Sequence, residues 1–482
     1  IVIVFVVGCF ISQNTNIGAK VKKNADDVKA LKEIIKSQYK KGGKVSKNLN
    51  DKEEYGWSKK NGKLIKINWS ETVRLKGSLN LSKLKNLKYL KCSDLNLKSL
   101  NISNLDKLEV VDCSVTGIKE LNVLNMKNLR KLNCSVSEIK VLNIVNVEKI
   151  KTLDCSGNKI KELEVTCLKN LIKLNCFNNP IKKLDLSNLT KLKYLDYGAT
   201  NIKSLDLNDI KNLRYLGCAY NQIRKLNITK LKKLEVLDCH NNKIKKLDVS
   251  KLKKLKKMYC SKNKMTKLKL GRQKNLVELD CSKNSLSKLD VSKQKNLKFL
   301  YCHKNRIKKL KVSRLKKLED LYCSYNKIEQ LNTSKLKRLR DVKCSHNRLK
   351  LLKFGYAGDL EGIDCSYNQI IDLDVSKLTY LLELSCQYNK LKKLDVGRIE
   401  FLTYIDCSYN ELTELNMEGT YLLSSLNCRN NKLTQLNLRR CVGLTKLDCR
   451  NNQLKEVNII GLKKLKTIKH DKGVQFITYD IV

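Results

Sequence analysis

This 482-residue sequence lacks the short motifs that usually reveal an enzyme or a metal protein. Its 20 cysteines include no Cys-x-x-Cys pair, which argues against a structural zinc site. No nucleophile triad, metal-ligand cluster or phosphate-binding glycine loop is recognisable, so we expect no catalytic activity, no metal and no cofactor. Long apolar segments are missing too, since the continuous run from Ile1 to Val7 is too short to cross a bilayer. These absences favour a binding or scaffolding protein.

Acidic residues are scarce beside basic ones. The sequence has 47 Asp and Glu against 99 Lys and Arg, a formal charge of +52. Such a charge attracts polyanions, among them nucleic acid, anionic glycans, wall polymers and acidic lipid head groups. The alternative is that the lysines only keep the surface soluble or reflect a compositional bias. A hydrophobic content of 41% excludes wholesale disorder, so a folded chain is expected.

The first residues are typical of a targeting segment. Residues 1–18 begin with an apolar run and continue into polar residues, as at the end of a secretory signal. Within them, Val6-Val7-Gly8-Cys9 is similar to a bacterial lipobox, which makes Cys9 a candidate lipidation site. We therefore expect a secreted or cell-surface protein whose contact with a membrane, if it has one, is an N-terminal lipid anchor.

The cysteines recur every 21 residues. They fall at 92, 113, 134, 155 and 176 and then from 218 to 449, with Tyr197 in the one interrupted place. This makes 18 turns in register without an insertion, and His470 would be a nineteenth rung. A unit of this length cannot enclose a core alone, so the period predicts a solenoid in which each turn packs on its neighbours.

Each column of the repeat has a place in such a turn. One unit reads, at its key positions, Leu297-Leu300-Cys302-Asn305-Ile307-Leu310-Val312-Leu315. Residues two apart on a strand share a face, so Leu300 and Cys302 should both point inward. Asn stands three places after the ladder position in 14 of the 18 turns, where its amide can satisfy backbone groups as the chain leaves the strand. The early turns should be less regular, because the departures from Asn are Leu95, Thr116, Ser137 and Thr200.

The pattern Leu-x-x-Leu-x-Cys-x-x-Asn-x-Leu with this period resembles the bacterial leucine-rich-repeat surface proteins, particularly internalin-type proteins with a cysteine ladder. The resemblance covers residues 79–470. It implies an α/β-type repeat solenoid, a leucine-rich-repeat horseshoe with a parallel concave β-sheet and a largely irregular or 3-10 convex side. It also implies a secreted or wall-attached protein that serves in adhesion or recognition, with its ligand on the concave sheet.

Two further segments flank the repeats. Residues 19–78 predict an N-terminal cap, with an amphipathic helix at about residues 25–38 and strands at about 55–69. Residues 471–482 predict a closing strand at the other end. A solenoid needs such caps because its first and last turns would otherwise expose their apolar interior.

The ladder cysteines are interpreted as buried, reduced packing residues. Stacked parallel strands lie about 4.8 Å apart, whereas a disulfide requires Cβ atoms at about 3.5–4.5 Å and a crossed dihedral angle. Some disulfide formation and metal binding are the alternatives. A metal ion would need additional ligands that inward-facing cysteines do not provide.

Aromatic residues gather on the expected concave face in the second half of the chain. We assign to this face the residues three and one before each ladder position and one, two and four after it. Aspartates occupy the position before the cysteine in many turns. Exposed aromatics are typical of binding surfaces, although tyrosine also favours strands for stability alone. The candidate partner-binding residues are Tyr259, Phe299, Tyr301, His303, Tyr322, Tyr325, His346, Tyr367, Tyr388, Tyr404 and Tyr409.

Basic residues concentrate elsewhere. Residues 251–350 hold 32 Lys and Arg against 7 Asp and Glu, a net charge of +25, while residues 351–450 hold 12 against 13, a net charge of −1. The candidate polyanion-binding residues, called the basic ridges below, are Lys232, Lys233, Lys253, Lys254, Lys308, Lys309, Lys316, Lys317, Lys337 and Arg338.

The function expected from the sequence is an adhesion or recognition module. It would bind a host or bacterial surface protein or glycan, and its basic ridges would bind an anionic polysaccharide or wall polymer. The alternative is an intracellular scaffold for a polyanion or nucleic acid, which would require basic and aromatic residues interleaved along one groove. We expect a monomer.

Overall fold

The computed structural model describes residues 22–70 and 74–478, which fall into two compact units, Ile1–Lys149 and Ile150–Val482. The expected targeting segment at residues 1–18 and the candidate lipidation site Cys9 lie outside the described residues. Among the described residues no helix is long and apolar enough to span a membrane. Both units are parallel β-solenoids of stacked 21-residue coils, the leucine-rich-repeat fold.

The first unit begins with a helix and a short hairpin. Helix α1 (Ala25–Lys40) starts after Asn24, whose side chain accepts a hydrogen bond from the Asp27 backbone nitrogen at 3.0 Å. Strands β1 (Tyr55–Trp57) and β2 (Leu64–Asn68) pair antiparallel, and β2 then pairs parallel with the first repeat strand, β4 (Tyr89–Lys91). The hairpin thus covers the first turn, and Trp69, just after it, is fully buried.

The remaining strands of the first unit form two kinds of pair. We call front strands those that end immediately before a ladder position, and back strands those on the returning arc of the coil. The front strands are β4, β6 (Val110–Asp112) and β8 (Lys131–Asn133); the back strands are β3 (Lys76–Asn80), β5 (Asn96–Asn101), β7 (Glu120–Leu124) and β9 (Val141–Val145).

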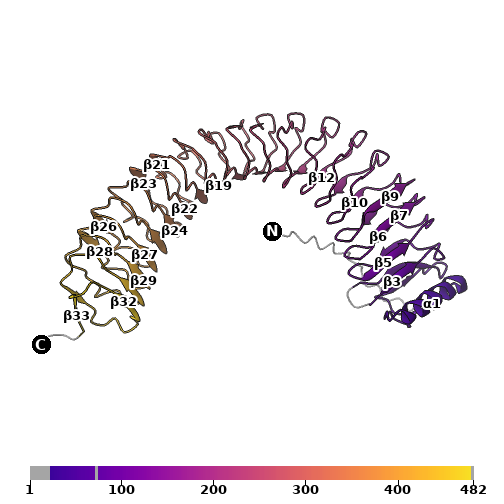
Figure 1. Ribbon diagram of the computed structural model, residues 1–482, viewed down its shortest axis with the longest axis horizontal. Helices are drawn as coiled ribbons and strands as arrows, with labels where there is room; N and C mark the ends of the chain where they lie inside the picture. Colours follow the sequence, from indigo (N-terminus) through magenta and orange to yellow (C-terminus); the bar gives the residue numbers. More distant parts are fainter. Residues whose placement is uncertain (1–21, 71–73, 479–482) are drawn as a thin grey trace. The chain divides into compact units, whose positions relative to one another are not determined.

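The second unit repeats this plan with shorter back strands. Its front strands pair in parallel with an unbroken 21-residue register, so that Leu279 pairs with Leu300 and Leu300 with Leu321. Figure 1 shows the front strands of this unit along one side of the coil and the back pairs on the other. The front strands are β10 (Thr152–Asp154), β11 (Lys173–Asn175), β12 (Tyr194–Asp196), β13 (Tyr215–Gly217), β14 (Val236–Asp238), β16 (Lys257–Tyr259), β18 (Glu278–Asp280), β19 (Phe299–Tyr301), β20 (Asp320–Tyr322), β22 (Asp341–Lys343), β24 (Gly362–Asp364), β25 (Glu383–Ser385), β27 (Tyr404–Asp406), β29 (Ser425–Asn427), β30 (Lys446–Asp448) and β32 (Thr467–Lys469).

The back side of the second unit consists of turns and short strand pairs. Among the described residues it contains no 3-10 helix, so the irregular form of the convex side that the family resemblance implied is the one observed. Each pair forms where the returning arcs of two consecutive turns both adopt an extended backbone. The pairs are β15 (Lys246–Asp248) with β17 (Lys267–Lys269), β21 (Gln330–Asn332) with β23 (Leu351–Lys353), β26 (Lys393–Asp395) with β28 (Glu414–Asn416), and β31 (Glu456–Asn458) with β33 (Gln475–Ile477).

The cysteine ladder lies inside the coil. All ladder cysteines are at most 1% exposed, and every cysteine among the described residues is free. Burial penalises the thiolate and raises the pKa of Cys323 to about 12, so the thiols are neutral packing groups. The prediction of buried packing cysteines is therefore confirmed. Tyr197 takes the same inward position and is fully buried as well.

The asparagine column connects neighbouring turns. The side-chain nitrogen of Asn326 donates to the carbonyl oxygens of Cys302 and Cys323, both at 3.0 Å, while its oxygen accepts from the Ile307 backbone nitrogen at 3.0 Å. One side chain thus satisfies three buried backbone groups in two turns. The same pattern recurs at Asn347 and Asn389. The expected role of the column in satisfying the backbone is confirmed.

Candidate binding surfaces

The outward residues of the front strands include a column of structural aspartates. Each front strand of the second unit has three residues, so only its first and third side chains point outward. The aspartate before the cysteine bonds to the serine after it: Oδ1 of Asp280 accepts from the backbone nitrogen and the hydroxyl of Ser282 at 2.9 and 2.6 Å. Asp364 and Asp406 repeat the pattern. These carboxylates cap the turn that follows the strand.

The tyrosines on the front strands bond to acids of the next strand. The hydroxyl of Tyr259 donates to Glu278 at 2.8 Å, and that of Tyr322 donates to Asp341 at 2.6 Å. Tyr301 makes a longer bond of 3.4 Å to Asp320. Burial, followed by the charge of Asp320, raises the pKa of Tyr301 to about 12. These phenols are therefore already engaged within the sheet.

The other candidates near these strands are only partly accessible. Phe299 and Tyr404 begin their strands and are half-buried. His303 follows its ladder cysteine and is also half-buried, and this burial lowers its pKa. None of these residues presents a freely exposed ring.

Five aromatic residues form one continuous column, which we call the tyrosine stack. Consecutive ring centroids lie 4.1–4.3 Å apart with interplanar angles of 9–14°, so each ring covers the face of the next. Tyr325, Tyr367 and Tyr388 are exposed, and the other two members are half-buried. The members of the stack are Tyr325, His346, Tyr367, Tyr388 and Tyr409.

The sequence interpretation had assigned the tyrosine stack to the strands of the sheet. The structure places it elsewhere. Each member sits two residues after its ladder position, in the turn beyond the strand, with a positive φ of 52–56°. Side chains with a Cβ atom rarely adopt this left-handed conformation. The turn requires it, since every turn has a positive φ at this position, whether the residue is Gly157, Asn178 or Tyr367. The stack therefore follows the edge where the front strands end.

A cation closes each end of the tyrosine stack. Lys304 Nζ lies 5.3 Å from the ring centroid of Tyr325, and the Arg429 guanidinium lies 4.8 Å from that of Tyr409. Arg429 also donates a hydrogen bond to the Tyr409 hydroxyl and is the first cause of that group's lowered pKa. With the ring faces covered by neighbours and cations, the stack offers a partner ring edges and hydroxyl groups.

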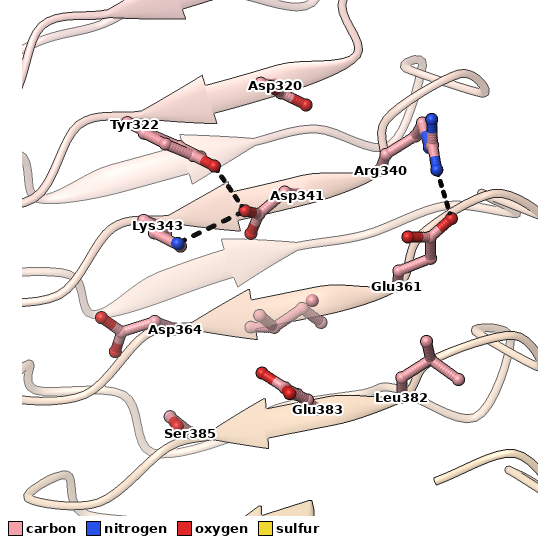
Figure 2. A pocket seen from close by; sticks show the side chains of 12 residues that line it. Asp320, Tyr322, Arg340, Asp341, Lys343, Glu361, Asp364, Leu382, Glu383 and Ser385 are labelled. Atoms are coloured by element: carbon pink, nitrogen blue, oxygen red, sulfur yellow. Dashed lines mark hydrogen bonds and ion pairs between the residues drawn. The ribbon is translucent and has the colours of Figure 1, made fainter. Parts of the chain in front are cut away.

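A hollow of about 410 Å³ opens on front strands β20, β22, β24 and β25, which belong to turns that also carry the tyrosine stack. It lies where Gly362 leaves a gap in the outward column, with the Asp341 carboxylate beside it. Figure 2 shows Tyr322 and Lys343 directed at Asp341, and Arg340 bonded to Glu361 at 2.7 Å. Five acids and two bases line the hollow, so it accepts hydrogen bonds and repels anions. The acids are Asp320, Asp341, Glu361, Asp364 and Glu383.

No metal-binding group is evident in the part of the chain that the structure describes. No three His, Cys, Asp or Glu side chains there are arranged to hold an ion. Four of the five acids around the hollow are instead engaged with tyrosines, serines and basic residues, as in Tyr322–Asp341 and Ser366–Asp364.

All ten residues of the basic ridges are exposed. They lie on the arcs before and after the front strands, away from the column of the tyrosine stack, and Lys233 Nζ donates to Asn212 in the preceding turn at 2.6 Å. Basic residues are not completely separated from the aromatic residues, however. Three other lysines, Lys262, Lys283 and Lys304, precede the tyrosine stack in its own column and share its left-handed backbone.

Two groups of residues were not found from the sequence. One is a half-buried acid: Tyr194 and Tyr215 stack with ring centroids 4.3 Å apart beside Asp196, and desolvation raises the pKa of this carboxyl to about 6. Gly217 takes the position of Asp196 in the next turn. Because glycine has no Cβ atom, the Asp196 carboxylate can occupy the space beside it; a Cβ atom on Gly217 would lie 2.6 Å from that carboxylate. The sequence did contain a signal for this site, because Gly217 stands in a column that carries polar residues in most other turns.

The second group is a set of exposed apolar side chains just before the last front strands, which we call the flank patch. At the same positions, earlier turns carry mostly Lys and Asn, and this change of residue type was the signal. The patch consists of Tyr380, Leu382, Phe401, Tyr421, Leu422 and Val442.

Comparisons with known proteins agree with this geometry. The family model for leucine-rich repeats (2 copies) matches residues 211–252 and 295–338. Among solved structures, the functional domain of InlJ from Listeria monocytogenes, which includes a cysteine ladder, is 27% identical with a TM-score of 0.52 over 74% of this chain. The chain spans 65% of the length of that structure. None of the curated proteins compared with the chain matches it.

Two more distant structures share the fold. YopM from Yersinia enterocolitica is 23% identical with a TM-score of 0.68, covering 83% of this chain and 91% of its own. The Arabidopsis receptor kinase HAESA, solved with the peptide hormone IDA and the co-receptor SERK1, is 19% identical with a TM-score of 0.57, covering 92% and 93%. At these identities the likeness concerns the solenoid alone.

Proposed function

This chain is an internalin-like leucine-rich-repeat protein with a cysteine ladder, and we propose that it is an extracellular or surface-attached recognition module. Leucine-rich-repeat proteins are protein-interaction modules, and HAESA is solved with a peptide hormone and a co-receptor. The proposed partner is a surface protein or glycan that binds along the front side of the second unit.

The tyrosine stack carries this proposal. Five rings held in parallel by their neighbours present a fixed row of edges and hydroxyls across five turns. Tyrosine is enriched in binding hot spots because it combines apolar area with a hydroxyl at a small entropic cost. A sugar ring usually packs on an aromatic face, and these faces are covered. The geometry therefore favours a protein partner, or a glycan held through its hydroxyls.

The basic ridges support a second, weaker contact with anionic polymer. Their side chains are exposed and solvated, so we propose a salt-dependent attraction that does not depend on polymer sequence. The acidic hollow would repel such a polymer, which keeps the two kinds of contact on separate surfaces.

One observation favours the alternative function, an intracellular scaffold for a polyanion or nucleic acid. Lys262, Lys283 and Lys304 lead directly into the tyrosine stack, so one column offers cations and then aromatics. Single-stranded nucleic acid is held by such combinations, although it stacks its bases on free aromatic faces.

An array of surface proteins, glycans and nucleic acids, probed at about 0.05 M and about 0.5 M salt, tests the proposal. We expect a protein or glycan ligand whose binding survives high salt, and a roughly tenfold or larger loss when Tyr367, Tyr388 and Tyr409 are all replaced by serine. Tyr220→Ser is the matched control, because Tyr220 occupies the same left-handed position outside the stack.

The outcomes separate the two functions. Unchanged binding by a folded triple variant would remove the tyrosine stack from the proposal. Binding only to nucleic acid, lost at high salt and in a chain found solely in the cytosol, would establish the alternative.

A further inference from the structure

The flank patch places exposed apolar side chains in columns that carry mostly polar residues in the earlier turns. Tyr380, Phe401 and Leu422 each lie three residues before a front strand and are 53%, 43% and 54% exposed. Val442 continues the patch in the next turn at 49%. In earlier turns, polar residues of the same column form hydrogen bonds with one another, as from Lys191 to Asn170 at 2.6 Å. The change to apolar residues is confined to the end of the second unit.

The patch is ordered as well as apolar. The rings of Tyr380 and Phe401 stack with centroids 5.5 Å apart and an interplanar angle of 5°. Leu422 and Val442 extend the row over two more turns, and Leu382 joins it to the rim of the acidic hollow. Contiguous exposed apolar surface of this kind marks an interaction site, because covering it releases the water that hydrates it.

Charge indicates what covers the patch. Two copies of a chain with a charge of +52 repel each other over most of their surfaces. Residues 351–450, which contain the whole patch, have a net charge of only −1, against +25 for the preceding hundred residues. Charges beyond about 8 Å are screened at physiological salt, so local neutrality is enough to permit contact. An acidic partner would instead bind the basic ridges.

We infer that the flank patch is a self-association surface, which pairs with the same patch of a second copy of this chain. A two-fold pairing requires a self-complementary surface, and the exposed rim carries both signs, with Arg398 and Arg440 beside Glu400 and Glu418. The pairing sets apolar side chains against apolar side chains and lets acids meet bases at the edge. The monomer expected from the sequence did not take this surface into account.

The size of the patch sets the strength of the dimer. Four turns spaced by about 4.8 Å make a row of about 15–20 Å, which is small beside interfaces of about 1,600 Å². We therefore expect a dimer in the micromolar range that leaves the tyrosine stacks free.

Sedimentation velocity over protein concentrations of about 1–100 µM tests the inference, at about 0.15 M and about 0.5 M salt. We expect a concentration-dependent dimer that is as strong or stronger at the higher salt, because apolar contacts are not screened. The variant Tyr380→Asn, Phe401→Lys, Leu422→Lys should weaken it at least tenfold. These residue types occupy the same column in earlier turns, as in Asn296, Lys233 and Lys254, so the fold tolerates them.

The control variant is Tyr220→Lys, which removes an equally exposed ring from a position where Lys262 and Lys283 occur. It should dimerise like the native chain. A monomer at every concentration, or an unchanged dimer in the triple variant with an intact circular dichroism spectrum, overturns the inference. So does a native monomer that instead sediments with phosphatidylcholine vesicles, since the patch would then be a lipid-binding surface.

Discussion

Replacing Asn326 with alanine should lower the free energy of unfolding by roughly 2–6 kcal/mol. One buried backbone group loses its partner, at about 1–3 kcal/mol, and two others each lose one of two hydrogen bonds, at about 0.5–1.5 kcal/mol per bond. The group left without a partner is the backbone nitrogen of Ile307. The carbonyls of Cys302 and Cys323 each lose the bond from Asn326 but keep a second one, from Asn305 and Asn347 respectively. Water cannot replace the side chain, since the cysteines are fully buried. Urea denaturation followed by circular dichroism measures the loss, and hydrogen exchange at the Ile307 amide locates it.

Two matched variants should lose less stability than Asn326→Ala. Asn326→Thr should cost less, because Thr200 in the equivalent position donates to the Tyr197 carbonyl at 3.0 Å and so retains one of the bonds. Asn296→Ala removes a half-buried asparagine whose hydrogen bond to the Lys274 carbonyl oxygen is exposed to solvent, and it should change stability by less than about 1 kcal/mol. Equal losses for Asn326→Ala and Asn296→Ala would show that the asparagine column is not a structural connection between turns.

Replacing Asp196 with asparagine should stabilise the protein at neutral pH and leave it unchanged in acid. Burial raises the pKa of this carboxyl to about 6, from an ordinary value of 3.8. Between these pH values the folded chain binds more protons than the unfolded chain, so stability falls as pH rises from about 4 to about 6. Above pH 6 the full cost is present, roughly 2–3 kcal/mol at about 1.4 kcal/mol per pKa unit.

Urea denaturation at pH 4 and pH 7.5 measures this prediction. The gain from Asp196→Asn should appear only at pH 7.5, where the native carboxyl is ionised. Asp248→Asn serves as the control of opposite sign: bonds to Ser250, followed by Lys269, hold the pKa of Asp248 at about 2. Its stabilisation is present above pH 4, is lost as pH falls through 2, and is small because the group is solvated. A gain for Asp196→Asn that is equal at both pH values would contradict the ionisation of a desolvated carboxyl group as the cause.

The repeat period made the core predictable from the sequence. A fixed interval places Cys302 and Cys323 in one column, and the only place for an apolar column in a stacked coil is the interior. The asparagine column followed from the same register. These predictions needed no knowledge of individual contacts, since each turn has the same neighbours.

The tyrosine stack was placed less accurately. Its column was correctly identified as continuous, but Tyr367 was assigned to the sheet although it lies in a left-handed turn. The signal was present, because Gly157, Asn178 and Asn241 occupy this column and such residues favour a positive φ. The high strand propensity of tyrosine concealed it.

Features that depend on a missing neighbour could not be predicted in the same way. The pKa of Asp196 depends on the absence of a side chain at Gly217 one turn later, and the acidic hollow depends on Gly362. The flank patch depends on a column in which the residue type changes near the end of the unit. Column-by-column comparison of turns, rather than the consensus, would reveal each of them.

Because the ladder cysteines are buried and protonated, their reactivity can report local unfolding of individual turns. Alkylating reagents attack thiolates, so a cysteine that is buried and neutral stays unlabelled while its turn is closed. Cys167 is exposed and marks the rate of an open site. Since almost every turn carries one such cysteine, peptide masses after brief labelling would report which coils fray first and how far the fraying spreads along the stack.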